Sequence, residues 1–221
     1  KTIEINHVSK SYGQKKLFCD FSHIVLRDER IGIVGPNGCG KSTLLKVITG
    51  KTAPDAGSVE MGETIRIGCF MQENEFEDET LRVIDYVKNI GEYVTTVDGK
   101  ITAGRMCERF LFTPDAQYTP IAKLSGGEKR RLYLLGILME APNVLILDEP
   151  TNDLDIETLT ILEDYIDNFV GMVIVVSHDR YFLDRVADRI FAFEGDGVIT
   201  QYEGGFSDYL EKAFAKGVVD R

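Results

Sequence analysis

The sequence predicts an α/β fold with a mixed or parallel core sheet, an N-terminal antiparallel β subdomain and an inserted helical subdomain. The N-terminal part reads as strands, a helical block follows, and after Ser125 helical patterns alternate with short apolar runs such as 144–148. Such β-branched runs without polar alternation are typical of strands buried on both faces of a parallel sheet. The 221 residues suit one large domain, 1–221, with the helical insertion at about 73–140.

The N-terminal part is predicted to pair as antiparallel strands. Its runs are rich in β-branched residues and partly alternate in polarity. A Gly-rich loop starting at Gly35 enters a helix that we expect to stop near Gly50. The strands expected in this part cover residues 2–8, 17–26, 31–35, 58–62 and 64–72.

The remainder of the chain is predicted to be helical first and then α/β. An acidic run at 73–79 precedes a block at 80–123 with helical spacing, and Pro114 and Pro120 mark its exit. The later helices are expected at 126–140, 156–168, 179–187 and 206–216, and the later strands at 144–148, 172–177 and 189–194.

Composition excludes several classes of protein. A net charge of −11 argues against a domain that coats nucleic acid, and we interpret Lys129, Arg130 and Arg131 as a solvated helix face. No apolar run reaches the roughly 18 residues of a membrane span, so we expect a soluble, cytoplasmic chain without direct membrane contact. The four cysteines form no C-x-x-C pair and are expected to be reduced thiols.

A phosphate-binding loop is the strongest motif. Residues 35–42 read G-x-x-x-x-G-K-S between a predicted strand and a predicted helix, which is the context that a P-loop requires. Glycines let backbone N–H groups turn toward an anion, the helix N-terminus adds partial positive charge, and Lys41 can reach the β- and γ-phosphates. The residues expected around the nucleotide are Gly35, Pro36, Asn37, Gly38, Cys39, Gly40, Lys41, Ser42 and Thr43.

Two carboxylates follow the apolar run at 144–147. Ligands bind at the carboxyl ends of parallel strands, so Asp148 and Glu149 are expected beside the phosphates. Asp148, together with Ser42, would hold Mg²⁺, and Glu149 would orient and deprotonate the attacking water. A D-E pair at a strand end is by itself a weak signal, and it gains its meaning from the phosphate loop.

A third motif, L-S-G-G-E at 124–128, resembles the signature of the ABC ATPase family, whose other motifs follow in the expected order. The resemblance covers nearly the whole chain and implies ATP as the nucleotide. It implies adenine stacking by Tyr12, a Q-loop glutamine at Gln72 that also binds Mg²⁺, a D-loop at 152–155 and a switch histidine at His178. The signature residues, which would serve the nucleotide of a facing domain, are Ser125, Gly126, Gly127 and Glu128.

These residues also have ordinary explanations. Ser125 and Glu128 fit a capping box at a helix start, and this can hold together with phosphate binding. Alone, Tyr12 would be a strand aromatic, Gln72 a surface amide and His178 a loop histidine. Because the signature opens the helical part, a single chain is not expected to fold it onto its own P-loop, so hydrolysis should need a second ABC domain, in the same chain or as a homodimer.

The stretches D-E-P-T-N-D-L-D and S-H-D-R-Y-F-L-D-R-V resemble the ABC-F branch, and F-L-F-T-P-D-A-Q-Y-T-P resembles the second ABC domain of Uup-type members. This implies a fragment of a longer protein with two ABC domains that acts on ribosomes; contact with nucleic acid is implied by the resemblance alone. Two alternatives stay open. One is the ATPase subunit of a membrane ABC transporter, which would grip a membrane domain near Gln72 and residues 80–110, and the other is a degenerate binding module.

Overall fold

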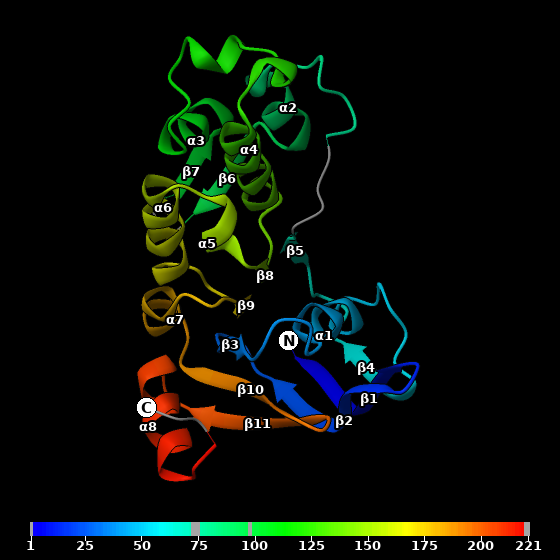
Figure 1. Cartoon of the computed structure of the whole chain (residues 1–221). Helices are drawn as coiled ribbons and strands as arrows, with labels where there is room; N and C mark the ends of the chain where they lie inside the picture. The colour runs from blue at the N-terminus through cyan, green and yellow to red at the C-terminus, as the bar shows by residue number, and fades with distance from the viewer. Residues whose placement is uncertain (1, 72–75, 97–98, 219–221) are drawn as a thin grey trace.

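A computed structural model describes residues 2–71, 76–96 and 99–218 of the chain (Figure 1). Within these ranges the strands form a six-stranded core sheet, a three-stranded sheet and a two-stranded hairpin. The core sheet has the order β11-β10-β3-β9-β8-β5, in which β11 is antiparallel to β10 and the other neighbours are parallel. The predicted mixed α/β sheet is therefore confirmed. Its strands are β3 Arg30–Val34, β5 Ile67–Phe70, β8 Val144–Asp148, β9 Met172–Val176, β10 Arg189–Gly195 and β11 Val198–Glu203.

Both faces of the core sheet are covered, which explains the unbroken apolar runs of its central strands. Along β8, Val144 and Ile146 belong to one buried cluster while Leu145 and Leu147 belong to the other. The first cluster includes residues of α1, and the second includes residues of the helices on the opposite face. The helices around the sheet are α1 Lys41–Ile48, α4 Gly126–Met139, α5 Pro150–Asp153, α6 Ile156–Asp167, α7 Arg180–Val186 and α8 Phe206–Ala215.

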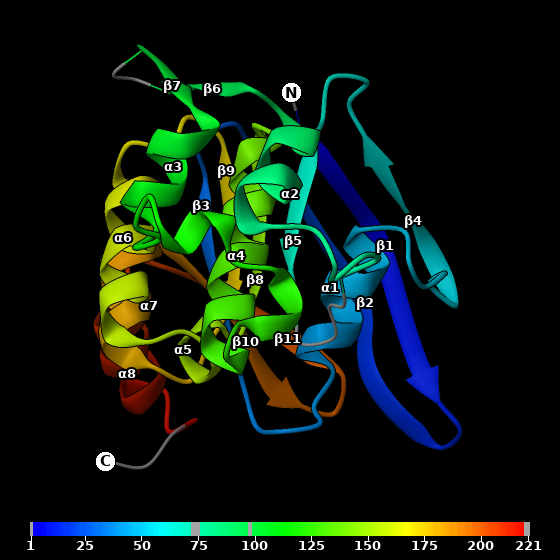
Figure 2. The ribbon, with the colours of Figure 1, turned by 90° about the horizontal axis from the view of Figure 1, so that it is seen from above.

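The N-terminal strands form the antiparallel sheet that the sequence predicts. Its order is β2-β1-β4, and both pairings are antiparallel. Figure 2 shows this sheet beside α1, on the far side of the molecule from α6 and α7. The strands are β1 Ile3–Tyr12, β2 Lys15–Val25 and β4 Ala56–Met61.

The insertion between β5 and β8 is not wholly helical, which corrects the expectation for 80–123. After α2 Val83–Ile90, the strands β6 Tyr93–Thr96 and β7 Gly99–Thr102 form a hairpin, and α3 Ala103–Arg109 follows. Val94 and Ile101 face each other across the hairpin and are both buried. The β-branched residues of these two short strands, with an Asp-Gly pair between them in the sequence, were the signal for a hairpin.

Besides the hairpin, the prediction also missed the strand β11. It follows a tight turn in which Asp196 and Gly197 have φ angles of 52° and 80°. Because β11 lies at the edge of the sheet, most of its residues stay partly exposed, so it lacks the continuous apolar run that marks the inner strands. The predicted helices after Ser125 agree with the structure to within one or two residues at each end.

Candidate functional site

The phosphate loop connects β3 to α1, as the sequence predicts. Gly38 and Gly40 have φ angles of 71° and 117°, which only glycine adopts readily. At Gly40 an added Cβ would also lie 2.9 Å from Leu17 Cβ. The loop therefore depends on these glycines for its shape, and it leads directly into the N-terminus of α1.

The ammonium groups of Lys41 and Lys15 donate hydrogen bonds to this loop. Lys41 is buried, and its Nζ donates to the carbonyl oxygens of Gly35 and Pro36, both at 2.8 Å. Lys15, from the start of β2, donates to the carbonyl of Gly38 at 2.7 Å. Two positive charges and a helix N-terminus around one loop favour a polyanionic ligand.

At the end of β8, Asp148 is buried and its Oδ1 has no hydrogen-bond partner among the described residues. Burial raises the pKa of this carboxyl, while a hydrogen bond with the Ser42 side chain and the charge of Lys41 act in the opposite direction. An unpaired buried carboxylate oxygen beside a hydroxyl fits the oxygen ligands that Mg²⁺ takes.

A magnesium site of this kind does not require a cluster of protein ligands. The described residues contain no group of three or more His, Cys, Asp or Glu placed to hold a metal ion. Mg²⁺ in nucleotide sites uses one or two carboxylates together with phosphates and water, so it does not need such a cluster. The residues present therefore fit Mg²⁺ bound with a nucleotide.

Glu149 is held in a left-handed backbone conformation, with φ 50°, at the junction of β8 and α5. Its N–H donates to the carbonyl of Val176 at 2.8 Å. Its side chain is buried, and its carboxylate lies 3.1 Å from Nε2 of His178 and accepts the His178 backbone N–H at 3.3 Å. Backbone strain of this sort costs free energy and is frequent at functional sites.

These elements converge on one cavity of about 340 Å³. It brings the two acids at the end of β8 together with the P-loop, and Tyr12, which is 54% exposed, forms part of the wall. Three lining residues, Lys15, Leu17 and Val176, were not predicted as site residues. The lining residues are Tyr12, Lys15, Leu17, Asn37, Gly38, Gly40, Lys41, Ser42, Thr43, Asp148, Glu149 and Val176.

A larger hollow of about 990 Å³ lies at the opposite, N-terminal ends of the core strands. It is bordered by β6, α3 and the end of α6, and none of the predicted site residues lines it. We place the candidate site in the smaller cavity, because the chemically active side chains meet there and because ligands bind at the carboxyl ends of parallel strands.

The signature residues lie outside the cavity. The predicted capping box is confirmed: Glu128 N–H donates to Ser125 Oγ at 3.2 Å, and Ser125 N–H donates to the Glu128 carboxylate at 2.7 Å. An added Cβ at Gly126 or Gly127 would meet nothing within 4 Å. The glycine pair at the start of α4 therefore faces open space, and intramolecular packing does not explain it.

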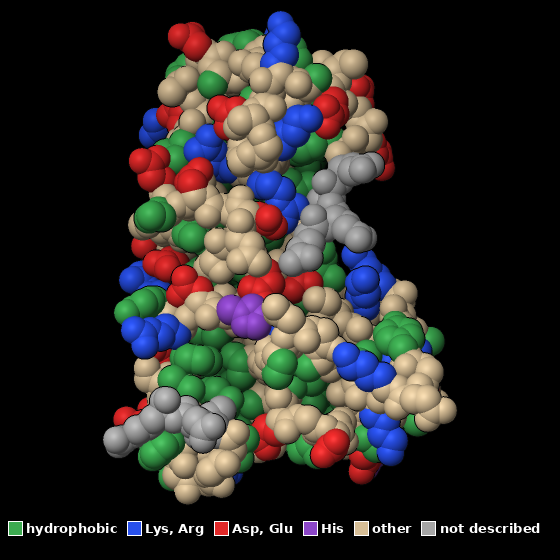
Figure 3. All heavy atoms as spheres, viewed as in Figure 1, with side chains coloured by type: hydrophobic (Ala, Val, Ile, Leu, Met, Phe, Trp, Pro, Cys, Tyr) green, Lys and Arg blue, Asp and Glu red, His purple; other side chains and the backbone are tan. Residues whose placement is uncertain are grey.

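The basic residues after the signature do not form the solvated face that we expected. Arg130 and Arg131 have side chains that are 17% and 12% exposed, and they pair with Asp153 and Asp155 at 2.7 and 3.9 Å. Lys129 pairs with Glu79. The face in Figure 3 likewise shows acidic and basic side chains interspersed rather than one basic patch. Gln72 lies outside the described residues.

Comparison with known proteins agrees with this geometry. The model of the ABC transporter family matches residues 19–152. The chain is 56% identical over 217 residues to the Bacillus subtilis protein described as uncharacterized ABC transporter ATP-binding protein YfmR, covering 98% of this chain and 34% of that one. It is 43% identical to the energy-dependent translational throttle protein EttA of Haemophilus influenzae and 42% identical to ATP-binding protein Uup of Escherichia coli.

The chain covers 38% of that EttA and 32% of that Uup, so it spans about a third of the length of these relatives. A solved structure of an ATP-binding subunit of an ABC transporter has the same fold, with a TM-score of 0.78 at 18% identity over 97% of this chain and 94% of that one. None of the helices in the described ranges has the length and hydropathy needed to cross a bilayer. The chain belongs to the ABC transporter family as an ATP-binding domain, and its relatives EttA and Uup place it in the ABC-F branch.

Proposed function

We propose that this chain hydrolyses ATP to ADP and phosphate, with Mg²⁺, as one half of a head-to-tail pair of ABC domains. The observation that carries the proposal is the convergence of Lys41 and Ser42 of the P-loop with Asp148 and Glu149 of β8 on one cavity. The two pairs are about a hundred residues apart in the chain, and a shared ligand with phosphate and metal accounts for the chemistry of the groups that meet there.

Binding of ATP would use the loop and the wall of the cavity. The backbone N–H groups of residues 37–43 and the Lys41 ammonium would hold the phosphates, and Tyr12 would stack on the adenine. The Lys41 ammonium donates hydrogen bonds to the Gly35 and Pro36 carbonyls, which hold it at the loop. Fixing this flexible side chain in advance reduces the entropy lost on binding.

Mg²⁺ would be held by Asp148, the Ser42 hydroxyl and Gln72. When bound, it would supply positive charge that offsets the negative charge on the phosphates during hydrolysis. The carboxylate oxygen of Asp148 that has no partner is the group available for this role, directly or through a water molecule.

Glu149 would act as the base for the attacking water. The water oxygen bonds to the γ-phosphorus as the bond to the β-phosphate oxygen breaks, and a water proton passes to the Glu149 carboxylate. His178 holds that carboxylate from both its ring and its backbone N–H, so it would set the direction in which Glu149 faces the water.

Pairing would complete each site. Ser125, Gly126 and Gly127 are exposed and do not line the chain's own cavity. A capped helix start with two glycines offers N–H groups to an anion brought by another molecule. We therefore propose that the signature of each domain contacts the γ-phosphate on the other.

The test of this activity is phosphate release by the wild type and by Glu149→Gln. The variant should bind ATP as tightly as the wild type but hydrolyse it at least about a hundredfold more slowly, because the amide cannot accept the proton. Glu211→Gln, on the exposed face of α8, is the matched control and should leave the rate unchanged. Wild-type hydrolysis by Glu149→Gln would remove Glu149 from this role.

We further propose that the whole protein is an ABC-F protein acting in translation. The support is that a relative at 43% identity is described as an energy-dependent translational throttle protein. The full-length protein carrying Glu149→Gln should sediment with ribosomes when ATP is present and less when ADP replaces it. The opposite result is a protein that is missing from the ribosome fraction with either nucleotide and is recovered in membranes together with a protein of several membrane spans. That result would favour the alternative of a transporter ATPase subunit.

A further inference from the structure

The side chain of Arg130, on α4, contacts two other elements, the end of β5 and α5. Its Nη2 donates to the carbonyl oxygen of Met71, just after β5, at 2.9 Å. The same nitrogen donates to Oδ2 of Asp153, at the end of α5, at 2.7 Å. Its guanidinium carbon lies 4.2 Å from the centre of the Phe70 ring. One arginine on α4 thus contacts the end of β5 and the segment after β8.

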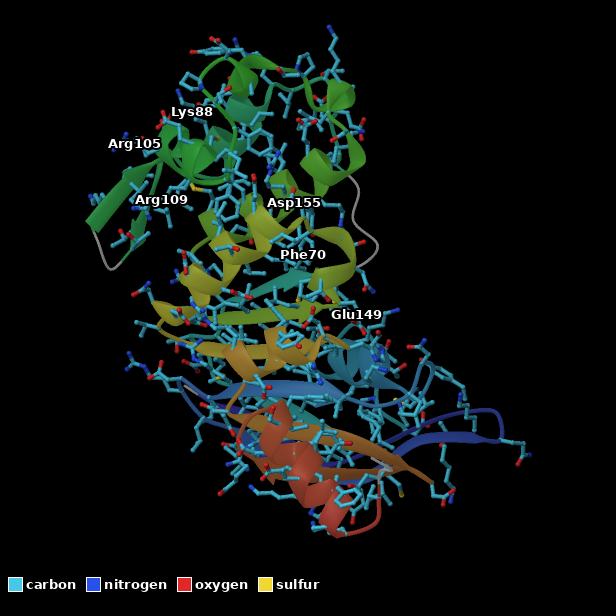
Figure 4. All side chains as sticks on the ribbon, turned by 60° about the vertical axis from the view of Figure 1, so that its left-hand side comes forward. Phe70, Lys88, Arg105, Arg109, Glu149 and Asp155 are labelled. Atoms are coloured by element: carbon cyan, nitrogen blue, oxygen red, sulfur yellow. The ribbon has the colours of Figure 1, made fainter. Side chains whose placement is uncertain are left out.

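Each of these contacts lies close in the chain to a group of the proposed site. Met71 immediately precedes Gln72, Asp153 follows Glu149 by four residues, and Arg130 follows Ser125 by five. Figure 4 shows Phe70 and Asp155 above Glu149, toward the helical segments. Arg130 therefore connects the helix that carries the signature with the two segments that lead to the metal and to the water.

Stability alone does not account for this arrangement. The Arg130 side chain is 17% exposed, and its Nε and Nη1 atoms are buried without a hydrogen-bond partner in the described part of the chain. Buried polar groups without partners cost free energy, and an apolar side chain over Phe70 would avoid that cost. A partly buried ion pair of this sort is better explained by the specific placement that it imposes on its neighbours.

We propose that Arg130 is a positioning residue that holds the signature helix, the end of β5 and the segment after Glu149 in one relative placement. This inference rests on the proposed function, because it concerns the hydrolysis carried out at that site. Arg130 does not line the cavity, so it acts on the rate through Glu149 and the signature rather than on ATP binding.

The experiment compares Arg130→Met, Arg130→Lys and Asp153→Asn with the wild type, at a temperature well below every unfolding midpoint. Arg130→Met keeps an unbranched apolar side chain but loses both hydrogen bonds, so kcat should fall about tenfold or more while the Kd for ATP stays unchanged. Asp153→Asn should lower kcat similarly, and the double variant should be no slower than the slower single one, since both remove the same interaction. Arg130→Lys, which keeps the charge, should restore part of kcat.

Lys129→Met is the matched control. Lys129 lies on the same helix as Arg130, but its ammonium pairs with Glu79, at 2.7 and 2.8 Å. The kcat of Lys129→Met should therefore equal that of the wild type. If the wild type hydrolyses ATP and both Arg130→Met and Asp153→Asn match its kcat, this inference is wrong and the proposed function stands. A wild type that binds ATP and hydrolyses none at any protein concentration overturns the proposed function and this role with it.

Discussion

At the scale of single residues, the site is built from groups that a stable protein would avoid. Asp148 is a buried carboxyl with an unpaired oxygen, and Glu149 has a left-handed backbone. Burial raises the pKa of Asp148 above the 3.8 of an exposed aspartate, which means that the folded state disfavours the ionised form. Such conflicts between stability and local structure are expected where a ligand supplies the missing partner.

The first prediction concerns Asp148→Asn. A group whose pKa is raised on folding stabilises the folded state below its unfolded value, and this contribution is lost as pH rises through the folded pKa. Removing the charge should therefore raise Tm of the nucleotide-free protein at pH 7, and the gain should shrink as the pH is lowered toward 3.8. Thermal unfolding across this range measures the effect, and an unchanged or lower Tm at pH 7 would contradict the assigned cost of burial.

The second prediction concerns Lys41→Ala. The variant loses the ammonium at the phosphate loop, and a hydrogen bond to a charged group contributes about 1.5–3 kcal/mol. ATP affinity should fall by roughly 10- to 100-fold, measured by titration calorimetry. Lys51→Ala, an exposed lysine beyond α1, should bind as the wild type does. Unchanged affinity in Lys41→Ala would contradict the P-loop assignment.

At the scale of elements, α4 shows how a helix start can serve both folding and binding. The capping box of Ser125 and Glu128 satisfies N–H groups at its first turn. Gly126 and Gly127, which follow Ser125, are poor helix formers, and an added Cβ at either would meet no described atom within 4 Å. Farther along the same helix, Gly136 has the opposite surroundings, since an added Cβ would lie 2.5 Å from the Tyr86 hydroxyl.

The third prediction compares Gly126 with Gly136. Gly126→Ala should leave the stability unchanged or raise it by up to about 1 kcal/mol, because alanine favours the helix and meets no atom. It should nevertheless slow hydrolysis, since the added methyl group occupies the surface that the facing nucleotide must approach. Gly136→Ala should instead lower Tm. Chemical denaturation and phosphate release measure both, and a Gly126→Ala protein with the wild-type rate would contradict the role of the signature in pairing.

At the scale of the whole molecule, the fold places the signature apart from the cavity that the P-loop and the two acids line. The P-loop and the acids lie together at the carboxyl ends of the core strands, while the signature opens a helix whose first residues do not reach that cavity. Under the proposed pairing, a chain with this arrangement would offer one binding face for ATP and one for the ATP of another domain. Closing such a pair around nucleotide is a shift between open and closed populations.

The fourth prediction follows from this separation. For the isolated chain, phosphate released per molecule should rise with protein concentration, because the active species is a pair. The Ser125→Ala variant loses its helix N-cap, which costs about 1 kcal/mol of stability. Its phosphate release should rise less steeply with protein concentration. A high rate that does not depend on concentration would mean that one chain suffices.

Local features of the sequence predicted much of the fold and of the site. The P-loop and the signature are contiguous, so their glycines, lysine and capping pair determine their conformations within a few residues. The inner strands are marked by continuous apolar runs, because both of their faces are buried. The hairpin at 93–102 and the edge strand β11 were missed because short or half-exposed strands leave only a weak pattern.

What the sequence alone determined is the set of chemical groups and the local shape of each motif, since neighbouring residues impose these. Only the tertiary structure decided the distant contacts that no motif predicted: Glu149 with His178, and Arg130 with Asp153 and Met71. Arg130 and Arg131 read as a solvated face because charge patterning carries no information on what packs over a helix. Contacts between residues far apart in the chain depend on how the layers pack, and that packing is a property of the whole fold.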